Sequence, residues 1–194
     1  SDVCSSDLYR PHKVSDVIIS NSLKTVFQQF VDQKNIPNLI LSGPPGTGKT
    51  TIAQAMLEEL ECDYIVINGS LQGNIDTLRY DIMNFASSVS FGGGRKYVIL
   101  DEADYLNPNS TQPALRKFME DFSKNCGFIF TCNFKNRIIE PLHSRCTVID
   151  FNILKAENVK LASLFFKHVC NILDMEKIKY EQGAVAKVIQ KFFP

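Results

Sequence analysis

Residues 43–50 read Gly-Pro-Pro-Gly-Thr-Gly-Lys-Thr, which matches the phosphate-binding loop pattern at every specified position. Gly46 and Gly48 allow backbone angles that bring successive N–H groups onto phosphate oxygens, and a helix beginning here adds the positive end of its dipole. We expect Lys49 to reach the β and γ phosphates and the Thr50 hydroxyl to bind Mg²⁺. The alternative is a glycine-rich helix start without a nucleotide.

Two carboxylates follow an apolar stretch farther along the chain. Residues 97–100 read Tyr-Val-Ile-Leu, and Asp101 and Glu102 come directly after them. Ligands bind at the carboxyl ends of strands in open α/β sheets. We expect Asp101 to hold Mg²⁺ through water and Glu102 to orient and deprotonate the attacking water. An acidic pair by itself is more often a solvated strand end, so this interpretation depends on the phosphate loop.

Residues 101–104 read Asp-Glu-Ala-Asp, a tetrapeptide that also occurs in DEAD-box helicases. Nothing else in the sequence resembles such a helicase, because its second motor domain and its RNA-binding motifs are missing. We therefore set that interpretation aside.

Two further polar residues lie near later apolar stretches. Asn133 ends Phe-Thr-Cys-Asn at 130–133, and Arg145 lies in Ser-Arg-Cys at 144–146. We expect Asn133 to hydrogen-bond the γ-phosphate or the water, although a lone Asn at a strand end is more often a turn former. The planar guanidinium of Arg145 suits phosphate charge, and its alternative is a surface salt bridge. The pattern leaves open whether Arg145 acts on its own nucleotide or on a neighbour's.

The elements that must position these residues are short apolar stretches alternating with segments of helical period. The expected strands are residues 38–41, 64–68, 97–101, 127–133 and 147–151. The expected helices are residues 22–33, 49–60, 74–88, 111–123, 157–173 and 181–192. This alternation predicts an α/β fold with a parallel five-stranded sheet between helices and right-handed crossovers. The strands stop after residue 151, and the last two helices suggest the start of an α-helical second domain.

The composition is that of a folded globular protein, with 44% hydrophobic and 22% charged residues among 194. Lys and Arg total 21 and Asp and Glu total 21, so DNA binding must come from a local patch or from several copies together. The six cysteines form no C-x-x-C pair, and we expect reduced, mostly buried thiols and no structural zinc. The apolar stretches are too short to span a bilayer, and we expect a cytoplasmic protein without membrane contact.

Several motifs occur together in one order along the chain. They are residues 9–11, 43–50, 67–70, 75–76 with Arg79, 101–104, 115–120, 138–141 and 144–146. With this arrangement the sequence resembles the AAA+ ATPase subunits of sliding-clamp loaders, of the replication factor C small-subunit type, and it is similar to the large clamp-loader subunit of tailed phages. The resemblance covers nearly everything from residue 9 to residue 194.

The resemblance implies ATP and Mg²⁺ as cofactors and gives roles to individual residues. Glu102, Lys49 and Asn133 would be catalytic, and Arg145 would be an arginine finger that enters the neighbouring subunit's site. Thr50 and Asp101 would hold the metal. The residues around ATP would be Tyr9, Arg10, Val17, Ile18, Pro45, Gly46, Thr47, Gly48, Lys49, Thr50 and Thr51, of which Tyr9, Arg10 and the segment near Val17 and Ile18 would wall the adenine pocket.

The family also implies residues that couple the ATP sites to one another and to DNA. These would be Gln112, Arg116 and Arg79, with Lys117, Lys135 and Arg137 as contacts to phosphates. Their alternative is a solvated surface, since an isolated exposed Lys is usually only hydrated. Asn74 stands where phage relatives tend to carry a basic residue, which puts one coupling contact in question.

The function implied by the resemblance is that of an ATPase, active in an oligomer, which opens a ring clamp and places it on DNA during replication. Its partners would be other clamp-loader subunits in a hetero-pentamer, the ring-shaped sliding clamp and primer–template DNA, in the host-cell cytoplasm if the protein is phage-encoded. One alternative is another AAA+ DNA-processing machine, such as a branch-migration helicase subunit. Another is a non-hydrolysing assembly subunit that binds ATP as structural glue, against which intact Lys49 and Glu102 argue.

The resemblance divides the chain into three parts. Residues 9–151 would be the AAA+ ATPase domain, and residues 152–194 part of a helical lid domain. The lid arginine that contacts the γ-phosphate, and the collar domain, would lie beyond Pro194. We interpret residues 1–8 as non-native sequence, because the octapeptide can be back-translated into the read-through of a common sequencing adapter and no initiating Met precedes it.

Overall fold

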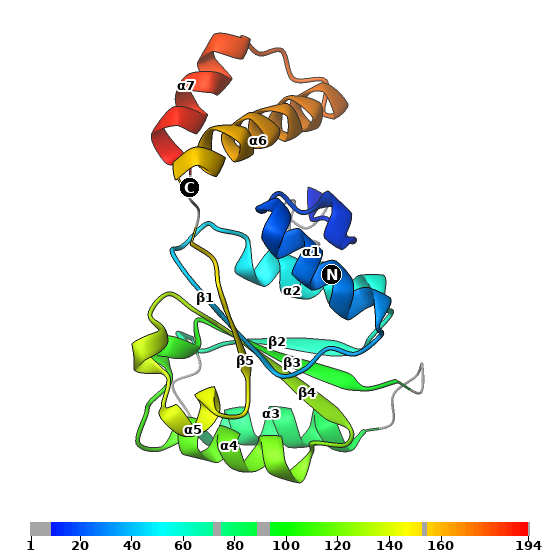
Figure 1. Ribbon diagram of the computed structural model, residues 1–194, viewed down its shortest axis with the longest axis vertical. Coiled ribbons are helices and arrows are strands. Elements are labelled where there is room, and N and C mark those ends of the chain that lie inside the picture. Colours follow the sequence, from blue (N-terminus) through cyan, green and yellow to red (C-terminus); the bar gives the residue numbers. More distant parts are fainter. Residues whose placement is uncertain (1–8, 72–74, 89–93, 153–154, 194) are drawn as a thin grey trace.

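The computed structural model describes residues 9–71, 75–88, 94–152 and 155–193, and Figure 1 shows a sheet between helices with two more helices beyond one end. The strands are β1 Leu39–Ser42, β2 Tyr64–Asn68, β3 Lys96–Asp101, β4 Cys126–Cys132 and β5 Thr147–Asp150. The helices are α1 Asn21–Asp32, α2 Lys49–Glu59, α3 Ile75–Ser87, α4 Thr111–Asp121, α5 Glu140–His143, α6 Lys155–Met175 and α7 Gln182–Phe192. The 3₁₀ turns used below are η2 Val14–Asp16, η3 Ala103–Tyr105 and η4 Lys135–Arg137.

The five strands form one sheet in the order β2-β3-β4-β1-β5. Every neighbouring pair is parallel. Parallel strands all point their carboxyl ends to the same edge, so the loops after β1, β3 and β4 meet there. The predicted parallel α/β sheet is confirmed, and each predicted strand and helix lies within two residues of the observed bounds.

Helices cover both faces of this sheet. Helices α1 and α2 lie on one face, and α3, α4 and α5 lie on the other (Figure 1). The strands buried on both faces read as continuous apolar runs, as in residues 97–100 and 128–130.

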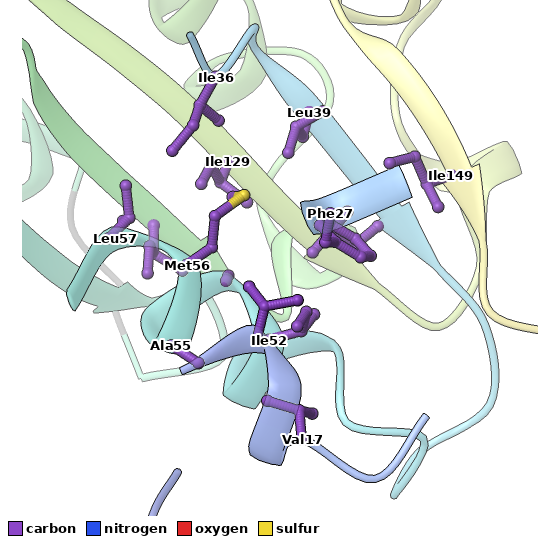
Figure 2. Close-up of a cluster of buried hydrophobic side chains, with 14 of the residues drawn as sticks. Val17, Phe27, Ile36, Leu39, Ile52, Ala55, Met56, Leu57, Ile129 and Ile149 are labelled. Atoms are coloured by element: carbon purple, nitrogen blue, oxygen red, sulfur yellow. The ribbon is translucent and has the colours of Figure 1, made fainter. Parts of the chain in front are cut away.

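The first of two apolar cores fills the space between the sheet and helices α1 and α2. Phe27 from α1 and Met56 from α2 meet Ile129 of β4 there, and Val17 closes the cluster from the N-terminal segment (Figure 2). Burying each such side chain contributes roughly 1.5–3 kcal/mol. This core fixes α2, and therefore the phosphate loop before it, against the sheet.

The second core lies under α3, α4 and α5. Leu78 and Ile82 of α3 and Leu115 of α4 pack on Phe128 and Phe130, whose rings stack at 6.5 Å between centroids. This core fixes the carboxyl ends of β3 and β4 relative to each other.

Helices α6 and α7 follow the last strand and pack on each other beyond the phosphate-loop end of the sheet (Figure 1). The ring of Phe165 in α6 lies 5.6 Å from that of Phe193, the residue after α7. None of the helices in the described part of the chain has the length and apolar character needed to span a membrane. The predicted pair of helices after the sheet is therefore observed, while its assignment as part of a lid domain stays a prediction.

Candidate nucleotide site

The phosphate loop joins β1, an interior strand buried along its length, to the N-terminus of α2. Gly46 and Gly48 have φ angles of 76° and 85°, in the left-handed region that favours glycine. The Thr47 hydroxyl donates to the carbonyl of Pro44 at 2.8 Å and closes the loop on itself. The loop therefore has the backbone shape that the sequence predicts, and it leads directly into a helix N-terminus, which favours anions.

Lys49 is buried at the start of α2, with 8% of its surface exposed. Its Nζ donates to the carbonyl of Gly43 at 2.7 Å, to that of Pro44 at 2.8 Å and to Oδ1 of Asn133 at 3.1 Å. Burial lowers the pKa of the Lys49 ammonium, and the charge of Asp101 acts in the opposite direction. Within the described residues no carboxylate forms an ion pair with this ammonium, so a buried cation is held only by neutral oxygens.

Asp101 ends β3 and lies beside Thr50 of α2. The Thr50 hydroxyl donates to Oδ1 of Asp101 at 2.6 Å, and the Thr131 hydroxyl donates to the same oxygen at 2.5 Å. Glu102 follows with a φ of 53°, and its backbone N–H donates to the Thr131 hydroxyl at 3.1 Å. Thr131 of β4 thus fixes both members of the acidic pair.

Asn133 comes directly after β4, beside the phosphate loop. Its Oδ1 is one of the three acceptors around the Lys49 ammonium. Sequence position alone allowed a turn former here, whereas the structure brings the amide to the lysine of the phosphate loop. Its role toward a γ-phosphate stays a prediction.

A pocket of about 690 Å³ lies between the phosphate loop and helices α6 and α7. From one side it is lined by Val17, Ile18, Gly46, Gly48 and Thr51, all of them predicted ATP-binding residues. The other side is apolar and comes from both helices after the sheet: Phe165, Val169, Leu173, Val185, Val188 and Ile189.

Tyr9 and Arg10 were also predicted to wall this pocket, but neither is among its lining residues. The Tyr9 hydroxyl instead donates to Glu176, immediately after α6. Val14 is completely buried, and its backbone N–H donates to Glu59 of α2 at 2.8 Å. The N-terminal segment thus contacts α2 and the residue that follows α6.

The residues present fit ATP and Mg²⁺. A buried ammonium surrounded by neutral carbonyl and amide oxygens, next to a helix N-terminus, suits a phosphate chain. The Thr50 hydroxyl and the Asp101 carboxylate, 2.6 Å apart, are the hard oxygen donors that Mg²⁺ prefers. The apolar pocket beside the loop has the character of a site for a flat aromatic base.

Arg145 lies after α5, on the face of the sheet covered by α4. Its Nη2 donates to Oε1 of Glu120 at 2.6 Å, and its Nη1 donates to the carbonyl of Pro141 at 2.9 Å. Arg116 donates to the same Glu120 oxygen at 3.4 Å. Arg145 therefore makes the salt bridge that its sequence allowed as an alternative, and action on a neighbour's nucleotide stays a prediction.

Gln112 is almost completely buried, with 1% of its surface exposed. Its Nε2 donates to the carbonyls of Leu106 and Arg137, both at 3.0 Å, and its Oε1 accepts the N–H of Ile139 at 2.8 Å. The solvated helix face allowed from the sequence is wrong for Gln112. This side chain joins the segment after η3 to the segment after η4.

Comparison with known proteins decides the family. The family described as "ATPase family associated with various cellular activities (AAA)" matches residues 39–153, more than half of the chain. The chain belongs to the AAA family of ATPases. The match runs from β1 past β5 and so includes the phosphate loop, Asp101, Glu102, Asn133 and Arg145.

Relatives of this AAA chain include replication factor C small subunits and sliding-clamp-loader large subunits. A replication factor C small subunit from Archaeoglobus fulgidus is 37% identical over 187 residues, which are 93% of this chain and 56% of that protein. A sliding-clamp-loader large subunit from Enterobacteria phage T4 is 36% identical over 189 residues, 96% of this chain and 59% of that protein. The chain therefore spans between half and two thirds of the length of these relatives.

Solved structures with the same fold include RuvB of Thermotoga maritima, described as a Holliday junction branch migration motor. Its TM-score is 0.69 at 20% identity, over 93% of this chain and 59% of that one. At this identity the likeness shows the AAA fold alone.

The basic residues predicted to contact DNA lie at the surface of the AAA domain, each in a different setting. Arg79 is 3.7 Å from Asp76 on α3, and Lys135 pairs with Asp150 at 2.9 Å. The Arg137 guanidinium lies over the ring of Phe134, and Lys117 is exposed on α4. Asn74 lies outside the described residues.

Two groups of site residues escape sequence reasoning. Thr131 reads as an ordinary strand residue, because threonine is common in strands. The α6 and α7 side chains of the pocket read as the apolar stripes of amphipathic helices. Thr131 lies two residues before Asn133, but this spacing alone assigns it no role.

Proposed function

We propose that this AAA chain is the ATPase module of a sliding-clamp-loader subunit, which uses ATP binding and hydrolysis to open a ring clamp and place it on primer–template DNA. The observation that carries the proposal is similarity at 36–39% identity to clamp-loader subunits over 93–96% of this chain. That similarity extends beyond the sheet into α6 and α7. The proposal includes the complete protein's partners, which are other loader subunits, the clamp and DNA, and a cytoplasmic location.

In this proposal the phosphate loop binds the triphosphate. The Lys49 ammonium leaves the carbonyls of Gly43 and Pro44, 2.7 and 2.8 Å away, and turns to the phosphate oxygens. A buried ammonium gains most from an anionic partner, which opposes the effect of burial on its pKa. Mg²⁺, held by Thr50 and Asp101, would neutralise charge on the phosphates.

Glu102 acts as the base that accepts a proton from the attacking water. It is half-buried, its backbone N–H is held by the Thr131 hydroxyl, and it directly follows the proposed metal ligand Asp101 in the chain. Asn133 is in contact with Lys49 and is suited to orient the γ-phosphate or the water. Hydrolysis thus requires the ends of β3 and β4 to keep their relative positions.

Arg145 would act on the nucleotide of the adjacent subunit. Its side chain is one third exposed, and its guanidinium contacts Glu120 of α4 and the carbonyl of Pro141 and none of the residues that contact the Lys49 ammonium. Entry into a neighbour's site would require the contact with Glu120 to be rearranged or broken. A guanidinium on the transferring phosphate stabilises the charge of the transition state.

The first test asks whether the loop binds nucleotide. For the Lys49→Met variant we expect loss of the rise in stability that Mg²⁺-ATP gives the unsubstituted chain, about 2.7 kcal/mol at a concentration of 100 Kd. Thermal unfolding with and without Mg²⁺-ATP measures it. Lys124→Met, on an exposed lysine, is the matched control and should respond as the unsubstituted chain does. An equal response in Lys49→Met would contradict the nucleotide site.

The second test uses the complete protein assembled with its partner subunits. Arg145→Ala is expected to bind ATP and to lose the hydrolysis that clamp and DNA stimulate. Retained stimulation would contradict the assignment to a neighbour's site.

The same assays separate the two alternatives. Strand separation without a clamp would support a branch-migration motor, whose solved relatives share only the fold at 17–20% identity. ATP binding without turnover in the assembled complex would support a non-hydrolysing assembly subunit.

A further inference from the structure

The carboxyl ends of β3 and β4 are joined by two side-chain links. In the first, Thr131 of β4 donates to Asp101 and accepts the backbone N–H of Glu102. In the second, Oδ2 of Asp104 in η3 accepts the backbone N–H of Phe134 at 3.3 Å. In the first link the side chain belongs to β4, and in the second it belongs to the segment after β3. Each strand end thus contributes one side chain to the contact with the other.

In the sequence, Asn133 lies between the two linked residues on the β4 side. Thr131 lies two residues before Asn133, and Phe134 directly follows it. The amide of Asn133 is in contact with the Lys49 ammonium at 3.1 Å. The position of this amide relative to the acidic pair therefore depends on both links.

Asp104 is an unusual residue for such a link because its carboxylate is buried, with 6% of the residue exposed. Within the described residues no Lys, Arg or His forms an ion pair with it, and its Oδ1 is buried without a hydrogen-bond partner. A buried carboxylate of this kind has a cost in stability. Burial lowers the pKa of Lys49, and the charge of Asp104 is among those that raise it, so the Asp104 carboxylate interacts electrostatically with the lysine of the phosphate loop.

We propose that Asp104 is a positioning residue for ATP hydrolysis, which acts through the backbone N–H of Phe134 to hold Asn133 in place relative to Glu102. The proposal gives a role to the fourth residue of the Asp-Glu-Ala-Asp sequence. It rests on the proposed hydrolysis of ATP by this site, and it does not depend on clamp loading.

The physical reason is that chemistry at the γ-phosphate tolerates little displacement. Phe134 is the residue before the turn η4 and is 54% exposed, and its ring lies under the Arg137 guanidinium and not in either apolar core. Core packing therefore does not hold this backbone in place. Without the bond to Asp104 the backbone N–H of Phe134 loses its acceptor, although the next residues stay anchored through Lys135 and Asp150 and through Gln112 and the Arg137 carbonyl. Among the described residues, the direct bonds from the end of β4 to the acidic pair are then those of Thr131. A shift of about 1 Å in a catalytic group costs on the order of 100-fold in rate.

A pair of conservative variants separates position from charge. Asp104→Asn keeps an acceptor oxygen at the same distance from the backbone and removes the charge. Asp104→Glu keeps the charge and moves the carboxylate by one methylene. We expect Asp104→Asn to hydrolyse ATP within about threefold of the unsubstituted chain, and Asp104→Glu to be slower by roughly 10-fold to 100-fold.

The measurements are single-turnover ATP hydrolysis by the complete protein assembled with its partner subunits, and the Kd values of ATP and ADP for the chain, all with Mg²⁺. Both variants should bind ADP as the unsubstituted chain does, because ADP lacks the phosphate that Asn133 faces. Asp104→Glu should lose part of the preference for ATP over ADP. Asp121→Ala, on an exposed aspartate at the end of α4, is the control and should change neither quantity.

The reverse order of rates, with Asp104→Asn the slower variant, would overturn the proposal, because the charge and not the position would then matter. Equal loss of ADP and ATP binding in Asp104→Glu would also overturn it, since that indicates a structural role. If the assembled unsubstituted protein binds ATP without hydrolysing it, the proposed hydrolysis fails. The preference for ATP over ADP in the two variants still decides the role of Asp104 in that case.

Discussion

Glu120 contacts two arginines to which the clamp-loader resemblance gives roles outside this ATP site: Arg145 in the neighbouring subunit's site and Arg116 in coupling to DNA. Its Oε1 accepts from Arg145 at 2.6 Å and from Arg116 at 3.4 Å. The two guanidinium groups compete for one carboxylate oxygen at the protein surface. A ligand that takes Arg116 from this oxygen, such as a DNA phosphate, would change the hydrogen bonding of the carboxylate that holds Arg145.

The pH dependence of Glu120 tests this arrangement. Hydrogen bonds from Arg145, and then from Arg116, lower the pKa of the Glu120 carboxyl below its ordinary value of 4.5. A carboxyl with a lowered pKa in the folded chain contributes stability above its unfolded pKa, and this contribution is lost as the pH falls through the folded value. We expect Arg145→Ala to raise the pKa of Glu120 more than Arg116→Ala does, because its contact is shorter.

An NMR titration of the Glu120 carboxyl carbon measures both effects. Arg79→Ala is the control, since Arg79 lies on α3 next to Asp76 and should leave the titration unchanged. A larger rise in Arg116→Ala than in Arg145→Ala would show that the order of the two contacts is wrong.

At the level of single residues, the sequence predicts the site residues that lie at or directly after the carboxyl ends of strands. Thr50, Asp101 and Asn133 come together because the carboxyl ends of β1, β3 and β4 share one edge. The link made by Thr131 is not predictable, because it depends on which strands are neighbours in the sheet. The bond that the Phe134 N–H donates to Asp104 is not predictable either, since it joins the turn η3 to the residue before η4, which is distant in sequence.

At the scale of elements, the long helices and buried strands are well predicted because their periodicity and apolar runs are strong signals. The turns η2, η3 and η4 and the four-residue helix α5 are not predicted, since each is too short to show a period. These short elements carry Asp104 and the segments held by Gln112. The elements that connect the site with its surroundings are thus the ones that sequence periodicity fails to reveal.

Gln112 tests how strongly such a connection is built. Gln112→Leu would leave the carbonyls of Leu106 and Arg137 and the N–H of Ile139 without their partner in a buried setting. We expect the free energy of unfolding to fall by roughly 2–5 kcal/mol, because each unpaired buried group costs about 1–3 kcal/mol and these costs overlap. Urea unfolding measures the difference.

The control is Gln29→Leu on the exposed face of α1, for which a change within about 0.5 kcal/mol is expected. If Gln112→Leu were as stable as this control, the three hydrogen bonds would contribute nothing to the junction between η3 and η4. Gln112 would then be only a filler of space.

For the whole molecule, the decisive feature is that the pocket has two walls from different parts of the chain. The phosphate loop and the N-terminal segment form one wall, and α6 and α7 form the other. The amphipathic pattern of the two helices predicts their existence, but it does not predict which surface their apolar faces cover.

Equal numbers of acidic and basic residues leave the chain without a global field that would attract DNA.

The second wall can be tested with a single carboxylate. Val185 of α7 lines the pocket and is half-buried, so Val185→Asp puts a negative charge in an apolar wall that would face a bound base and its phosphates. We expect the affinity for ATP and for ADP to fall by about tenfold or more, because the charge must be desolvated when a nucleotide binds. Titration with a fluorescent nucleotide measures both Kd values. Val159→Asp, on an α6 residue that is 78% exposed and outside the pocket, makes the same change of charge and should bind as the unsubstituted chain does. Equal binding by both variants would mean that the nucleotide contacts only the phosphate-loop wall, and that α6 and α7 take no part in holding it.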